Sequence, residues 1–118
     1  MSVITIVLAL LVAAEFLFIF YLETIATTSP HTARTFSMTI DELSRPSMST
    51  LFKNQGVYNG ILAILLLVAA LVIPSKTAVI ALSASMVAVA AYGAATSDPK
   101  ILLKQGLLPA VYLVSCLI

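Results

Sequence analysis

Four long apolar segments alternate with short polar ones along this chain. Only Glu15 interrupts the first segment. The segments cover residues 3–22, 56–73, 77–96 and 101–118. Each has about the length that a helix needs to cross roughly 30 Å of hydrocarbon, and none shows the alternation that a transmembrane β-barrel requires. The pattern predicts four membrane-spanning helices over about residues 2–23, 54–73, 77–96 and 100–117.

The polar breaks predict how these helices connect. Residues 74–76 and 97–100 are short enough for hairpin turns, so consecutive helices should run antiparallel. The expected fold is all-α: a four-helix transmembrane bundle with up-down connections, formed by the whole chain as one domain. A longer polar connection, residues 24–53, separates the first two helices. Within it, Thr39 and Glu42 have capping-box spacing, which indicates either a short helix on the membrane surface or an ordered polar loop.

Composition supports a membrane protein and excludes several other classes. The 118 residues are 61% hydrophobic and 9% charged, against about 25% charged in soluble domains. The net charge of +1, without a basic run, argues against a nucleic-acid partner. One histidine, one cysteine and the absence of a known cofactor motif predict no metal site and no cofactor.

The basic residues predict an orientation. Five of the six lie in the long connection or around the last turn, against Lys76 at the other end: Arg34, Arg45, Lys53, Lys100 and Lys104. The positive-inside rule therefore puts the long connection in the cytoplasm and both termini outside the cell membrane.

This threading gathers polar residues in the cytoplasmic half of the bundle. Four polar residues open the second helix, namely Asn54, Gln55, Tyr58 and Asn59. At 100° per residue they fall within a wedge of about 140°, which we expect to point inward. Gly56 and Gly60 lie beside the wedge at a spacing that permits close helix packing, for which the third helix offers alanines. The candidate binding residues are Glu15, Asn54, Gln55, Tyr58, Asn59, Tyr92, Thr96 and Gln105. The alternative is that the wedge only bonds helices together.

Glu15 is the most informative single residue. An ionised carboxylate within the membrane is costly, so such a residue is a functional candidate by default. We expect it to face the bundle and to be hydrogen-bonded to Asn59, Tyr58 or Tyr92. Glu23, about 12 Å further along the axis, is expected in the headgroup region. A purely structural hydrogen bond is the alternative role for Glu15.

These residues also carry a family resemblance over nearly the whole length. Its most specific part is residues 54–60 (NQGVYNG), supported by residues 92–96 (YGAAT), by Pro109 after Gln105, and by Glu15. The chain resembles a family of small bacterial membrane proteins catalogued as domain of unknown function 1304. The resemblance implies a four-helix membrane protein of this length and no established activity. Family members often carry a histidine directly after the first glutamate, where this chain has Phe16, so a Glu–His pair is not implied here.

Three functions fit these patterns. The first is binding or transport of a small polar or cationic ligand, which in so small a protein would require a homodimer in the lipid bilayer. The second is a structural or regulatory membrane subunit. The third is an enzyme acting on a lipid-like substrate, with Glu15 as general acid or base and Tyr58 or Tyr92 as its partner.

Overall fold

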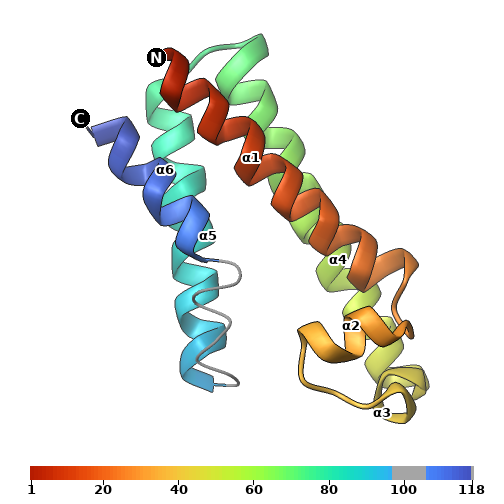
Figure 1. Ribbon diagram of the computed structural model, residues 1–118. Helices are drawn as coiled ribbons and strands as arrows, with labels where there is room; N and C mark the ends of the chain where they lie inside the picture. The colour runs from red at the N-terminus through yellow and green to blue at the C-terminus, as the bar shows by residue number, and fades with distance from the viewer. Residues whose placement is uncertain (97–105, 118) are drawn as a thin grey trace. The chain divides into compact units, whose positions relative to one another are not determined.

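The computed structural model describes residues 1–96 and 106–117, without the side chains of residues 94 and 96. All regular structure in that part is helical, which confirms the all-α prediction (Figure 1). Three helical stretches are long and apolar enough to cross a membrane, namely Val3–Ile25, Pro46–Val72 and Lys76–Gly93. A shorter apolar helix covers Leu107–Leu117. The predicted last turn, residues 97–100, lies outside the described residues.

The helices form two compact units. Residues Phe16–Ile61 make up one unit, called here the connection unit. Residues Met1–Glu15 and Leu62–Ile118 make up the other, called here the hairpin unit. Helices α1 (Val3–Phe20) and α4 (Pro46–Leu67) run through both units.

Both of these helices end in a wide π-helical turn. Helix α1 continues as η1 (Tyr21–Ile25), where the N–H of Ala26 donates to the carbonyl of Tyr21 at 2.8 Å. Helix α4 continues as η2 (Val68–Val72) with the same spacing. A π turn takes in an extra residue, so side chains within and after it leave the angular positions of an ideal α-helix.

The connection between the first two spans contains two short helices, α2 (Pro30–Thr35) and α3 (Ile40–Ser44). The capping box predicted at the start of α3 is present, with the Thr39 side chain bonded to the Glu42 N–H and the Glu42 carboxylate bonded to the Thr39 N–H. Helix α2 ends where Ser37 adopts a left-handed conformation with φ of 56°.

Helix α4 begins eight residues earlier than the sequence pattern predicted, at Pro46 instead of residue 54. Proline suits the first turn of a helix because its φ is fixed and the missing N–H would be unpaired there. The preceding Arg45 is extended, with φ of −63° and ψ of 132°, as expected before proline. The hydrophobic pattern did not predict this first part of α4, because residues 46–50 are mostly polar.

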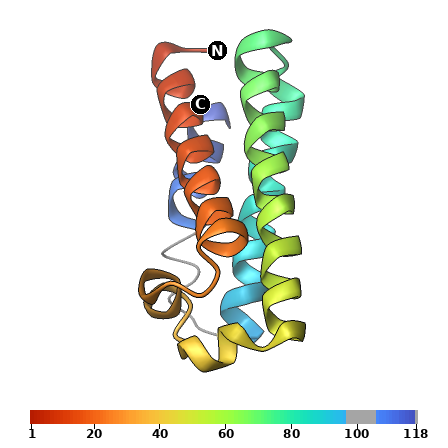
Figure 2. The ribbon, with the colours of Figure 1, turned by 90° about the vertical axis from the view of Figure 1, so that its right-hand side faces the viewer.

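In the hairpin unit, helix α5 (Lys76–Thr96) packs against α6 (Leu107–Leu117) and η2. Ser75 caps α5 by accepting a hydrogen bond from the Ala78 N–H at 3.2 Å. Figures 1 and 2 show the start of α1 and the end of α6 at the same end of this unit. Tyr112, Met86 and Val79 are fully buried in its core.

Candidate functional site: a buried carboxyl–amide pair

A glutamate and an asparagine meet in the interior of the connection unit. Glu23 in η1 is 4% exposed, and Asn59 in α4 is 5% exposed. The Asn59 Nδ2 donates to Glu23 Oε1 at 2.6 Å. Among the described residues, no cationic side chain pairs with this carboxyl. The pair is a candidate binding site because a buried acid without a counter-charge is costly unless it binds a proton or a cation.

The position of Glu23 near the end of the first span explains why the sequence pattern did not single it out. A count of 100° per residue puts Glu23 about 80° around the helix from Glu15, and its position near the end of the span suggested the headgroups. In the structure, η1 buries two consecutive residues, Leu22 and Glu23. On an ideal helix Glu23 lies only about 20° from the buried Phe16, so the helical period itself could have indicated its buried face.

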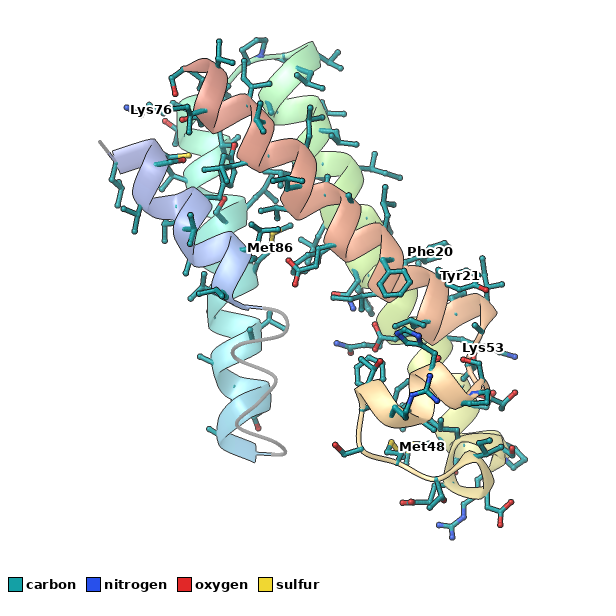
Figure 3. The ribbon with its side chains drawn as sticks, viewed as in Figure 1. Phe20, Tyr21, Met48, Lys53, Lys76 and Met86 are labelled. Atoms are coloured by element: carbon teal, nitrogen blue, oxygen red, sulfur yellow. The ribbon has the colours of Figure 1, made fainter. Side chains whose placement is uncertain are left out.

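Two glycines of α4 allow the first span to approach closely. A Cβ built on Gly56 would overlap Thr24 Oγ1 and come within 3.0 Å of Glu23 Cβ. A Cβ on Gly60 would lie 3.1 Å from Phe20 Cδ1. Figure 3 labels Phe20 where α1 passes into η1. The tight contact predicted for these glycines is confirmed.

The predicted partner of this contact was wrong. We expected the third span, but the structure gives the contact to the end of the first span. Alanines 84, 88 and 91 of α5 are instead exposed. Small residues permit a close approach without specifying which helix makes it.

Threonine hydroxyls complete the site. They donate to one carbonyl of α4 and to several carbonyls at the end of the first span. The Thr24 hydroxyl donates to the Lys53 carbonyl in α4 at 3.0 Å. The Thr27 hydroxyl donates to the Glu23 carbonyl at 2.7 Å. Thr32, fully buried, reaches the carbonyls of Ala26 at 2.7 Å and Leu22 at 3.1 Å. The carbonyls of Leu22, Glu23 and Ala26 lie at a helix end, where intrahelical donors are lacking, so these bonds together with the Thr24–Lys53 bond fix the local position of Glu23.

The predicted wedge divides between two faces of α4. Asn59 is buried, whereas Asn54, Gln55 and Tyr58 are exposed, the last at 70%. Expecting all four to point inward was therefore wrong for three of them. The contact with the first span is centred on Gly56 and Gly60. On a helical wheel Asn59 lies about 80° from this centre, whereas the three exposed residues lie about 120° or more away.

The remaining predicted residues do not belong to the connection unit. Tyr92 is 73% exposed on α5. The Thr96 side chain and all of Gln105 lie outside the described residues. Glu15 is half-buried in the hairpin unit, and its Oε2 is buried without a hydrogen-bond partner in the described part of the chain. The bond expected between Glu15 and Asn59 would join the two units and stays a prediction; within the connection unit Asn59 bonds to Glu23.

The chemistry available at the pair is that of oxygen ligands and proton exchange. Among the described residues, no group of three His, Cys, Asp or Glu side chains could hold a metal ion. The amide N–H of Asn59 can donate to the carboxyl in either protonation state, so it orients Glu23 while the charge of Glu23 changes. The site can therefore hold a proton or a small cation without losing its orienting bond.

Comparison with known proteins finds relatives that have no assigned activity. The uncharacterised protein YpaA of Lactococcus lactis subsp. lactis (strain IL1403) is 46% identical over 116 residues, which is 98% of each chain. No solved structure matches. The family model described as "Protein of unknown function (DUF1304)" matches residues 10–117. The chain belongs to this family.

Proposed function

We propose that this is a multi-pass protein of the bacterial cell membrane that binds a small cation at Glu23. In this proposal its four helices cross the membrane antiparallel, with the long connection in the cytoplasm. Two copies would be needed to enclose a transport pathway, since four short helices are too few. The observation that carries the proposal is the buried Glu23 carboxyl, which is held by the Asn59 amide and lacks a described cationic partner.

The surroundings of Glu23 favour a cation over an anion or a neutral ligand. Glu23 lies two residues before the end of η1, where the helix dipole places partial negative charge. Hydroxyl-bonded carbonyls of Glu23 and Ala26 add oxygen atoms to the same helix end. The close contact at Gly56 limits the size of the ligand, so a proton and alkali-metal ions are the best candidates.

A proton-release assay tests this proposal. The detergent-purified protein is placed in weak buffer with a pH-sensitive dye, and sodium or potassium chloride is added. If the cation replaces a proton on Glu23, the wild type should release up to about one proton per chain. Glu23→Gln keeps the oxygen that accepts from Asn59 but cannot ionise, so it should release none. Glu42→Gln, a change at an exposed capping carboxylate, is the matched control and should behave like the wild type.

Equal proton release from the wild type and Glu23→Gln, or none from either, would overturn the proposal. It would leave the second candidate, a structural subunit, which also has a specific observation in its favour. The Glu23–Asn59 bond lies within the same contact as Gly56 and the Thr24–Lys53 bond, all of which join two helices. A structural role predicts that Glu23→Gln is tolerated in every assay, whereas Glu23→Leu is destabilising.

A further inference from the structure

A polar pocket lies in the hairpin unit, at the end where α1 and α5 begin and α6 ends. It has a volume of about 190 Å³. Its lining is Met1, Ser2, Thr5, Lys76, Ser115 and Cys116. We propose that this pocket binds a phosphate group. The proposal is independent of Glu23 and of the cation proposed there.

The charge of the pocket favours an anion. Lys76 carries three N–H donors and a positive charge, and its side chain is exposed. None of the lining residues is acidic. The acidic residue described in this unit is Glu15, ten residues beyond Thr5 and therefore about 15 Å along α1. Figure 3 labels Lys76 at this end of the unit.

The hydroxyl groups supply one further donor and one acceptor. Ser2 Oγ and Thr5 Oγ1 lie 2.9 Å apart, so one hydroxyl donates to the other and one proton remains free for a ligand. The Ser115 hydroxyl donates to the Tyr112 carbonyl at 2.6 Å, so its oxygen remains an acceptor. A phosphate oxygen can accept from Lys76 and the free hydroxyl. A hydroxyl on or beside the phosphate can donate to Ser115.

The size and depth of the pocket also suit a phosphate. Its volume is about six times the roughly 30 Å³ that a water molecule occupies in the liquid, which is enough for a tetrahedral anion. Two apolar spans begin beside it, at Val3 and at Lys76, so in a membrane it lies at headgroup level. The positive ends of the α1 and α5 dipoles and the negative end of the α6 dipole meet at this end, so the preference for an anion rests on Lys76. Phosphatidylglycerol and free phosphate both offer a phosphate with an adjacent hydroxyl.

Titrations of the full-length protein in detergent, after removal of bound lipid, test the proposal. One arm titrates inorganic phosphate, with sulfate at equal ionic strength as comparator. The other adds phosphatidylglycerol to the micelles, with phosphatidylcholine as comparator. The measurements are the dissociation constant by calorimetry and the shift in melting temperature. The variants are Lys76→Gln, Lys76→Arg and the matched control Lys53→Gln, another exposed lysine but in the connection unit.

Phosphate or phosphatidylglycerol should bind the wild type and raise its melting temperature. Lys76→Gln should weaken that binding about tenfold or more, because a charged hydrogen-bond donor is lost. Lys76→Arg should restore most of it, and Lys53→Gln should leave it unchanged. A response to phosphatidylglycerol alone identifies the lipid as the source, and a response to inorganic phosphate identifies a soluble one. No response in either arm, or equal losses from Lys76→Gln and Lys53→Gln, would overturn the proposal.

Discussion

Polar side chains behave differently in the two units. In the connection unit several of them bond between separate segments of the chain, beside local bonds such as that of Thr27 to the Glu23 carbonyl. Asn59 of α4 bonds to the Glu23 carboxyl of η1, and Thr24 of η1 bonds to the Lys53 carbonyl of α4. Thr32 of α2 bonds to carbonyls at the end of the first span. Each of these bonds exists only when two particular segments meet.

In the hairpin unit the hydroxyls bond back to their own helices. Ser83 donates to the Val79 carbonyl at 2.7 Å, and Ser85 donates to the Ala81 carbonyl at 2.8 Å. Such bonds satisfy a hydroxyl in an apolar environment without any second helix. They make polar residues tolerable there, but they do not specify a partner. The difference implies that substitutions in the connection unit disturb tertiary structure more than similar substitutions in the hairpin unit.

The largest expected effect is that of Gly56→Ala. The new methyl group would overlap Thr24 Oγ1, and the Thr24 backbone nitrogen at 3.0 Å leaves no room to move aside. We expect a loss of about 1–3 kcal/mol in unfolding free energy, measured in detergent by thermal or denaturant melting. Ala88→Leu, which adds more bulk at an exposed position of α5, is the control and should change little. A Gly56→Ala variant that melts like the wild type would show that the helices are not in contact there.

The second test compares the two glutamates of the first span. Glu23→Leu removes the acceptor of the buried Asn59 amide and should cost about 1–3 kcal/mol. Glu15→Leu removes an oxygen that has no described partner, so it should be neutral or slightly stabilising. Melting of both variants and of Glu23→Gln under the same conditions is the measurement. If Glu15→Leu were the more damaging change, the comparison between the units would be wrong.

The third test uses two buried hydroxyls. Thr32→Val keeps the shape of the side chain but leaves the Leu22 carbonyl without its hydroxyl donor, while the Ala26 carbonyl keeps only the Ser29 N–H. We expect a loss of about 1 kcal/mol. Ser83→Ala should cost much less, because the Val79 carbonyl keeps its backbone donor within the helix. Equal losses from the two would mean that bonds between segments matter no more than bonds within a helix.

The smallest expected effect is local and depends on pH. Hydrogen bonds from the Thr39 backbone and side chain hold the pKa of Glu42 below its ordinary value. The stabilisation of α3 by this carboxylate is therefore complete above the ordinary pKa of a glutamate. It is lost as the pH falls through the lower pKa of the folded state. Amide exchange of α3 should accelerate over that acidic range.

Glu42→Gln provides the control for this effect. Glutamine can still complete the capping box but does not titrate, so exchange in the variant should lack this pH dependence. Amide exchange in the rest of the connection unit should not depend on the protonation of Glu42, because the Thr39–Glu42 bond joins residues only three apart. A change in exchange throughout the unit that required Glu42 would show that this local bond also supports tertiary structure.

The sequence by itself determined the class of the molecule and several local features. Apolar runs of about 20 residues are typical of a membrane protein, and they located the three long apolar helices because length and hydropathy are properties of contiguous sequence. The capping box at Thr39 was predictable for the same reason, since its partners are three residues apart. The spacing of Gly56 and Gly60 predicted a close contact, because a missing side chain on one helix face is visible in the sequence.

Only the tertiary structure decided which groups meet. The helical period predicts the angles between Asn54, Tyr58 and Asn59 around α4. It does not predict which side of α4 packs against another helix. The partner of Glu23 depended on which face of α4 meets the end of the first span. Similarly, Lys76 and Ser115 are 39 residues apart in the chain and line one pocket only because α5 and α6 pack together. Local propensities extend over a few residues, whereas pairing of buried polar groups is fixed by packing between distant segments.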